Sequence, residues 1–224
     1  MRPAGPVRHV RRERRLGAVG RHAAAAMLGG AVAAGTGSAQ SPAPAESVGR
    51  PLAVATFAAG CFWCAEADFE KVPGVVDAVS GYTGGRAADP TYQQVSSGRT
   101  GHREAVQVIY DPGRVSYQRL LDVFWRNVDP TDAGGQFCDR GEQYTSAIFV
   151  ATDGERRLAE ASERAVERSG RLRGPVATAI LRAGPFYRAE EYHQAYAKKN
   201  PLRYKFYRTT CGRDRRLREV WGDR

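Results

Sequence analysis

Short apolar runs alternate with helical stripes along most of the chain. Residues 105–110 alternate sides in the manner of a half-buried strand, and 117–128 carries an apolar stripe at helical spacing. Similar patterns predict further strands at 54–58, 75–80, 146–151 and 176–181, and further helices at 65–71, 155–169 and 190–199. Two β-α-β passes in this order predict an α/β two-layer sandwich, with helices on a mixed, ferredoxin-like sheet. Little apolar periodicity remains beyond about residue 201, which predicts an irregular C-terminal tail.

The first fifty residues differ in composition from the rest. An arginine-rich segment precedes an apolar, alanine-rich run at 23–34, and small residues follow at 37–39. The apolar run is too short to cross a bilayer, so we interpret residues 1–39 as a secretory signal peptide that leaves no stable membrane insertion after processing. Residues 40–50 are interpreted as a disordered linker. The mature protein is then periplasmic or extracellular; the alternative is a cytoplasmic protein with a basic N-terminal tail.

Much of the positive charge belongs to this N-terminal segment. Seven arginines and one glutamate in residues 1–39 carry +6 of the net charge of +10 on the 224-residue chain, which leaves +4 for the remainder. The other arginines stand beside glutamates without interleaved aromatic residues, so nucleic-acid binding is not expected. Residues 51–224 are enough for one domain with a sizeable core. Nothing in the pattern suggests an obligate partner, so a monomer is expected.

The most informative stretch is a C-x-x-C motif formed by Cys61 and Cys64, with Phe62 and Trp63 between them. A strand pattern gives way to a helix pattern here, which predicts that Cys61 lies at a helix N-terminus, where its thiolate form is stabilised. A zinc site would need a second pair of ligands at suitable spacing, and the sequence offers none. A structural disulfide across so small a loop would restrain the unfolded chain little. The motif therefore favours redox chemistry.

The cysteines leave their pairing open. The four residues Cys61, Cys64, Cys138 and Cys211 allow three connectivities if all of them pair. A secreted enzyme can equally keep some of its thiols as redox-active groups. The C-x-x-C spacing favours this second view, since positions three apart in a helix lie close enough for a disulfide to form.

Aromatic and acidic residues add to the candidate chemistry. Phe62 and Trp63 beside a nucleophilic sulfur suit an apolar wall for a methyl or thioether group; the alternative is that both rings belong to the core. Glu104, at the start of the alternating strand, is a candidate acid that burial keeps protonated; the alternative is an exposed carboxylate. His102 and His193 are interpreted as structural histidines. Further polar candidates in predicted loops and the last helix are Tyr92, Asp139, Tyr144 and Tyr196.

Several motifs, in the right order between about residues 53 and 201, resemble peptide-methionine sulfoxide reductases of the A type. They are the runs 60–66 (GCFWCAE), 81–85 (GYTGG), 90–92 (PTY), 101–105 (GHREA), 129–131 (DPT), 143–148 (QYTSAI) and 191–194 (EYHQ). The resemblance covers nearly all of the presumed mature chain. It is far more specific than the C-x-x-C motif alone.

The resemblance implies a catalytic domain over 51–224 that repairs oxidised proteins by reducing methionine S-sulfoxide, protein-bound or free. Cys61 would attack the sulfoxide sulfur, Glu104 would protonate the oxygen, and Tyr92 and Tyr144 would hydrogen-bond to it. Phe62 and Trp63 would hold the S-methyl group, and Asp139 would support the pocket. No bound cofactor or metal is implied.

The recycling step is the least determined part of this expectation. The resemblance implies that Cys61 becomes a sulfenic acid, that a second thiol converts it to a disulfide, and that an external thioredoxin-like dithiol reduces the disulfide. The candidates for the second thiol are Cys64, then Cys211, then Cys138. Many relatives have a small residue at the position of Cys64 and use cysteines in a C-terminal tail instead.

Two other functions fit parts of the sequence. An exported thiol-disulfide oxidoreductase that acts on protein disulfides would carry a similar C-x-x-C at a helix start, but it would not require Glu104, Tyr92 or Tyr144. A small secreted binding module held by disulfides would use its cysteines for stability alone.

Overall fold

The computed structural model describes residues 51–222. The strands are β1 (Ala53–Ala58), β2 (Val75–Thr83), β3 (Arg103–Tyr110), β4 (Gly135–Gln136), β5 (Asp139–Arg140), β6 (Ala147–Val150), β7 (Ala179–Arg182) and β8 (Phe186–Arg188). The helices are α1 (Phe62–Phe69), α2 (Tyr92–Ser96), α3 (Tyr117–Arg126), the 3-10 helix η1 (Glu142–Tyr144), α4 (Asp153–Arg168), α5 (Tyr196–Lys199), α6 (Pro201–Thr210) and α7 (Arg213–Trp221).

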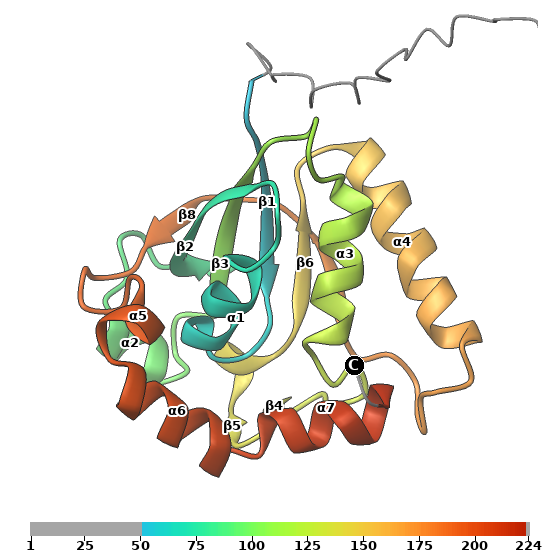
Figure 1. Cartoon of the computed structure of the whole chain (residues 1–224). Helices are drawn as coiled ribbons and strands as arrows, with labels where there is room; N and C mark the ends of the chain where they lie inside the picture. Colours follow the sequence, from blue (N-terminus) through green and yellow to red (C-terminus); the bar gives the residue numbers. More distant parts are fainter. Residues whose placement is uncertain (1–50, 223–224) are drawn as a thin grey trace, which may run out of the picture. The chain divides into compact units, whose positions relative to one another are not determined.

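The main sheet has the strand order β7-β6-β1-β3-β2-β8 (Figure 1). Neighbouring strands are antiparallel except for β6 and β7, which are parallel. The four central strands follow the order of a ferredoxin-like fold, because α1 connects β1 to β2 and α3 lies between β3 and β6 in the chain. The predicted fold class, a mixed α/β sheet covered by helices, is therefore confirmed.

The core lies between the sheet and the helices α1 and α3, which cover one face of it (Figure 1). Phe57 of β1 is fully buried there, and its ring stacks on those of Phe69 and Phe124, with centroids 5.0 Å and 5.4 Å away. The apolar stripe predicted for 117–128 faces this core, since Leu120 and Leu121 are fully buried. Helix α1 packs on β2 and β3, and its first turn meets β3 through the hydrogen bond of the Phe62 amide to Glu104.

Several local predictions were wrong. The tail beyond residue 201 is not irregular, because it forms α6 and α7. The helix predicted at 190–199 is reduced to α5, preceded by turns. Helix α2 and the short strands β4, β5 and β8 lie in segments interpreted as loops. These elements are short or lack an apolar stripe, so periodicity could not identify them.

The two terminal helices are held by contacts to distant parts of the chain. Pro201 occupies the first turn of α6, where its missing N–H costs nothing. Arg208 of α6 forms an ion pair with Asp68 of α1 at 2.9 Å. In α7, the Trp221 indole donates a hydrogen bond to the Val128 carbonyl at 3.0 Å, and Leu217 is buried. The tail thus becomes part of the domain through specific side chains.

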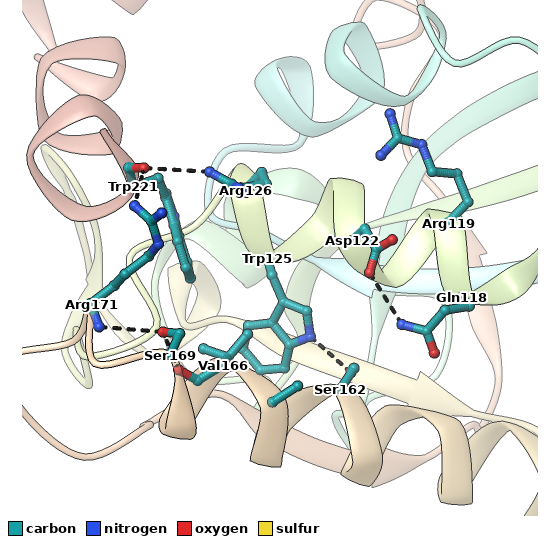
Figure 2. Close-up of a pocket in the computed structure, with 11 residues that line it drawn as sticks. Gln118, Arg119, Asp122, Trp125, Arg126, Ser162, Val166, Ser169, Arg171 and Trp221 are labelled. Atoms are coloured by element: carbon teal, nitrogen blue, oxygen red, sulfur yellow. Dashed lines mark hydrogen bonds between the residues drawn. The ribbon is translucent and has the colours of Figure 1, made fainter. Parts of the chain in front are cut away.

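A cavity of about 360 Å³ lies between α3, α4 and the end of α7 (Figure 2). Arg126 and Arg171 both donate hydrogen bonds to the Trp221 carbonyl at its edge, and the Trp125 indole donates one to the Ser162 hydroxyl at 2.9 Å. No cysteine lines this cavity. The hydrogen bonds at the edge of this cavity join the end of α7 to α3 and to the segment after α4.

The predicted signal peptide (1–39) and linker (40–50) lie outside the described residues. Within residues 51–222, none of the helices has the length and apolar character needed to cross a membrane.

Candidate active site

Cys61 stands at the junction of β1 and α1, as the motif predicts. It is the N-cap residue of α1, and its carbonyl accepts hydrogen bonds from the backbone amides of Cys64 and Ala65. Gly60 makes the turn possible with a φ of +79°, and a Cβ there would lie 2.6 Å from the Cβ of Gln136. The Cys61 side chain is only 5% exposed. The turn therefore holds the sulfur at the bottom of the site.

Glu104 lies beside the start of the same helix. Its side chain is 2% exposed, and its Oε2 accepts a hydrogen bond from the Phe62 amide at 3.0 Å. Burial raises the pKa of this carboxyl group to about 8, against the opposing effect of the Phe62 hydrogen bond. The burial expected from the alternating strand is thus present. The carboxyl group keeps its proton at neutral pH. It binds the backbone amide of Phe62, the residue that follows Cys61.

The two thiols of the C-x-x-C motif share one hydrogen bond, and their pKa values are shifted in opposite directions. Burial, followed by the contact with Cys64, raises the pKa of Cys61 well above its ordinary value. The pKa of Cys64 is lowered to about 7, chiefly by its hydrogen bond with Cys61. Burial therefore opposes the Cys61 thiolate expected at the helix N-terminus, which stays a prediction. Of the two thiols, Cys64 is the one that ionises more readily.

Tyr92 and Tyr144 approach the acid from two different segments. Tyr92 begins α2 and Tyr144 ends η1, and their side chains share a hydrogen bond. Burial, then the proximity of Glu104, raises the pKa of Tyr92 to about 12 and raises that of Tyr144 as well. Both phenols therefore remain protonated and can act as hydrogen-bond donors.

Phe62 and Trp63 belong to an aromatic cluster whose other members come mainly from the C-terminal part of the chain, while their role as a wall for the substrate stays a prediction. The Trp63 indole stacks on Tyr196, with centroids 3.7 Å apart and planes at 6°. Its Nε1 donates a hydrogen bond to Nδ1 of His193 at 3.0 Å. The His193 ring is buried against Phe62, with centroids 4.9 Å apart. His193 is thus a structural residue of the wall, whereas His102 binds backbone atoms of Gly85 and Ala87.

Asp139 lies in the short strand β5 and is joined to α6. Its Oδ2 accepts a hydrogen bond of 2.5 Å from the Tyr207 hydroxyl, and Tyr207 also hydrogen-bonds to Cys61. Burial raises the pKa of Asp139, an effect that Tyr207 and Arg213 oppose. Tyr207 therefore links Asp139 to the nucleophile.

The remaining two cysteines are joined to each other. A disulfide connects Cys138 to Cys211, with Cα atoms 4.9 Å apart, and ties the β4–β5 hairpin to the end of α6. Cys61 and Cys64 are the free thiols. Cys138, Asp139 and Cys211 also form a candidate metal-ligand group. Two of its three ligands are disulfide sulfurs rather than thiolates, so the group does not fit a metal in this state.

Several residues near the thiols were not predicted from the sequence. Tyr207, Arg208 and Arg213 come from the tail that was expected to be irregular. Tyr82 is fully buried against Phe62 and donates a hydrogen bond to Glu190 at 2.8 Å. Besides Cys211, the aromatic residues in 204–207 were the sequence feature that could have indicated a role for the tail. No sequence pattern indicated that they lie near Cys61.

A sulfur nucleophile next to a protonated carboxyl group and two phenols defines a thiol-based oxidoreductase that can protonate the oxygen of its substrate. The comparisons specify the class. The family model described as peptide methionine sulfoxide reductase matches residues 53–224.

Two relatives each match 75% of this chain. It is 53% identical over 169 residues to peptide methionine sulfoxide reductase MsrA of Bacillus licheniformis, which covers 75% of this chain and 93% of the relative. It is 56% identical over 169 residues to MsrA 2 of Caulobacter vibrioides, covering 75% and 85%. Methionine sulfoxide reductase A of Corynebacterium diphtheriae has a similar structure, with a TM-score of 0.61, 36% identity, and coverage of 69% of this chain and 78% of that one. The chain belongs to the peptide methionine sulfoxide reductase A family, whose members reduce methionine sulfoxide.

Proposed function

We propose that this enzyme reduces the S epimer of methionine sulfoxide, protein-bound or free, with Cys61 as nucleophile. The Cys61 sulfur bonds to the sulfoxide sulfur while its proton passes to the Cys64 thiolate, its hydrogen-bond partner. Glu104 gives its proton to the sulfoxide oxygen, and Tyr92 and Tyr144 donate hydrogen bonds to that oxygen. The protonated oxygen then moves as a hydroxyl group from the methionine sulfur to the Cys61 sulfur, while the bond between the two sulfurs breaks and its electron pair returns to the methionine sulfur. Methionine leaves, and Cys61 is left as a sulfenic acid. The observation that carries this proposal is the buried, protonated Glu104 beside Cys61.

Cys64 is the proposed resolving thiol. Its sulfur attacks the Cys61 sulfenic acid, its proton joins the leaving hydroxyl group to form water, and a Cys61–Cys64 disulfide results. Two observations support this choice over Cys138 and Cys211. Those two are already bonded to each other, and Cys64 is the thiol hydrogen-bonded to Cys61.

An external dithiol of the thioredoxin kind completes the proposed cycle. It supplies two electrons and two protons to the Cys61–Cys64 disulfide, so the enzyme holds no cofactor of its own. The proposed setting is outside the cytoplasm, in the periplasm or the extracellular space, on the strength of the signal-like composition of residues 1–39. There the enzyme would act as a monomer that repairs oxidised proteins.

One assay separates this function from its alternatives. The full chain is incubated with dithiothreitol and separated S and R epimers of a blocked methionine sulfoxide. We expect turnover of the S epimer only, and none after Cys61→Ser. A general thiol-disulfide oxidoreductase would instead reduce protein disulfides and leave both epimers unchanged. Equal turnover of the two epimers would contradict the proposal.

Mapping the disulfide after one turnover tests the resolving step. The enzyme receives one equivalent of substrate without reductant, and its peptides are analysed by mass spectrometry without reduction. We expect a Cys61–Cys64 bond beside an unchanged Cys138–Cys211 bond. A Cys61–Cys211 bond would assign resolution to the C-terminal cysteine instead.

A further inference from the structure

Arg213, at the start of α7, is a fully buried cation. It is 1% exposed, its Nη1 donates a hydrogen bond to the Ala59 carbonyl at 3.2 Å, and its Nη2 donates one to the Asn127 carbonyl at 2.7 Å. Its guanidinium lies 4.6 Å from the centroid of the Phe137 ring. Its Nε is buried without any hydrogen-bond partner among residues 51–222. The side chain therefore enters the domain directly below the turn that carries Cys61.

Arg213 forms no ion pair with a carboxylate in the part of the chain that the structure describes. Arg208, also near the thiols, pairs with Asp68 and Asp214 at 2.9 Å and 2.8 Å. The hydrogen bonds of Arg213 go to carbonyl dipoles, its guanidinium lies over an aromatic face, and the acidic groups that it influences are Asp139 and Cys64, whose pKa values it lowers. A buried charge without a counter-charge is costly, so the guanidinium favours the ionised forms of these neighbours.

We infer that Arg213 is a positioning residue of the thiol site, whose buried guanidinium supplies the counter-charge that keeps the Cys61–Cys64 pair singly ionised. The inference rests on the proposed function, in which the Cys64 thiolate accepts the proton of Cys61. Its geometric basis is the hydrogen bond to Ala59, two residues before Cys61, together with the burial of the guanidinium and the absence of an ion pair with a carboxylate among residues 51–222. Arg213 and then Arg208 also lower the pKa of Cys64.

The other charged groups around Cys64 do not replace this contribution. Asp68 acts in the opposite direction, while Glu104 and Tyr204 are neutral at pH 7 because burial raises their pKa values. The groups that face Cys64 are Cys61 and Asp68 from α1 and its N-cap, Glu104 from β3, Tyr204 and Arg208 from α6, and Arg213 from α7. Arg208 forms ion pairs with two aspartates, whereas Arg213 forms no ion pair among residues 51–222 and acts on both Cys64 and Asp139.

The position of Arg213 is secured from both ends of α7. Cys211, two residues before it, is held by the disulfide to Cys138. Arg216 forms an ion pair with Asp129 at 2.7 Å, and the Trp221 carbonyl accepts hydrogen bonds from Arg126 and Arg171 (Figure 2). The terminal helix is thus fixed to three separate segments, which hold the guanidinium in place.

The test is a titration of Cys64 in the Cys61→Ser background of the full chain, with the Cys138–Cys211 disulfide intact. Cys64 is then the one titrating thiol, and its ionisation is followed by thiolate absorbance in the ultraviolet. We expect Arg213→Met to raise the apparent pKa of Cys64 by about one unit, a tenfold fall in its ionisation constant. The matched control is Arg215→Met, which removes an exposed charge from the same helix and should leave the titration unchanged.

Arg213→Lys covers the case in which Arg213→Met does not fold. It keeps the charge and loses the guanidinium fork, so the apparent pKa should stay close to that of the parent. A rise in Arg213→Lys as large as the one expected for Met, or equal shifts in Arg213→Met and Arg215→Met, would overturn the inference. The titration contains no sulfoxide, so it tests the role of Arg213 separately from the proposed function. The expected pKa shift can be absent while the S epimer is turned over, and it can be present while the S epimer is not turned over.

Discussion

The Glu104 carboxyl group accepts a hydrogen bond from the backbone amide of Phe62 at 3.0 Å, which places the acid at the first turn of the helix that Cys61 caps. A helix N-terminus normally favours a charged carboxylate. Here burial outweighs that effect and raises the pKa of Glu104 to about 8. The helix start orients the acid, while the surrounding core keeps its proton in place.

Glu104→Gln should slow the formation of the Cys61 sulfenic acid while the fold is kept. The amide has the shape of the protonated acid but no proton to transfer, and general acids contribute about 10²- to 10⁴-fold. Single-turnover release of methionine, measured by rapid quench, checks this. The exposed acid Glu191 gives a matched control, Glu191→Gln, which should behave as the parent. An unchanged rate in Glu104→Gln would remove the residue from the chemistry.

The rate of this step should have a narrow pH optimum. It should rise as Cys64 ionises with a pKa of about 7, and fall as Glu104 loses its proton with a pKa of about 8. The two limbs belong to a coupled set of groups rather than to isolated residues. In Glu104→Gln the falling limb should vanish. A profile of single-turnover rates from pH 5 to 10 would show both effects, and a rate that keeps rising above pH 9 in the parent would contradict them.

Tyr92→Phe and Tyr144→Phe should each lower kcat/KM by about 10²-fold, because each removes one donor to the oxygen on which charge develops. Tyr192→Phe is the matched control, since that phenol is 58% exposed and is expected to lie outside the pocket. Steady-state kinetics with the S epimer measure the difference. Equal effects in all three variants would indicate a general loss of structure instead.

Trp63→Phe should raise KM by about tenfold with little change in kcat. It removes the hydrogen bond to His193 and much of the stacking on Tyr196, together worth about 1–2 kcal/mol. Trp125→Phe is the control, because that indole is equally hydrogen-bonded but packs between α3 and α4. It should lower stability and leave KM unchanged. A large loss of kcat in Trp63→Phe would show that the indole does more than bind.

The double variant Cys138→Ser/Cys211→Ser should be less stable and still turn over. Its disulfide spans 73 residues, and loss of such a cross-link lowers the free energy of unfolding by about 2–4 kcal/mol. Urea denaturation measures that loss. With Cys61 and Cys64 intact, one turnover should still give a Cys61–Cys64 disulfide. Accumulation of sulfenic acid in this variant would mean that the removed cysteines take part in resolution.

The sequence predicted the sheet and the location of the nucleophile because both depend on local pattern. Alternation identified β3 and hence the burial of Glu104, and the glycine before Cys61 identified the strand-to-helix turn. The resting ionisation of Cys61 could not be predicted in this way. Its pKa depends on Cys64 and on burial by segments far along the chain, including Tyr207.

The C-terminal part of the site was missed for a related reason. Helices α6 and α7 have no continuous apolar stripe, so their sequence lacks the usual signal. They form because individual side chains meet distant partners, such as Arg208 with Asp68 and Cys211 with Cys138. Which of three cysteine pairings occurs is likewise a property of the folded chain.

If Cys61 is the nucleophile, as proposed, its burial limits which oxidised methionines the enzyme can repair. Cys61 is only 5% exposed. Under the proposed mechanism, a sulfoxide would have to reach Cys61 at the end of an extended side chain. Methionines in mobile segments of an oxidised protein would meet this requirement, whereas methionines packed inside a folded protein would not. The enzyme would therefore repair accessible oxidised methionines first. It would reach those in a rigid core only after that core has opened.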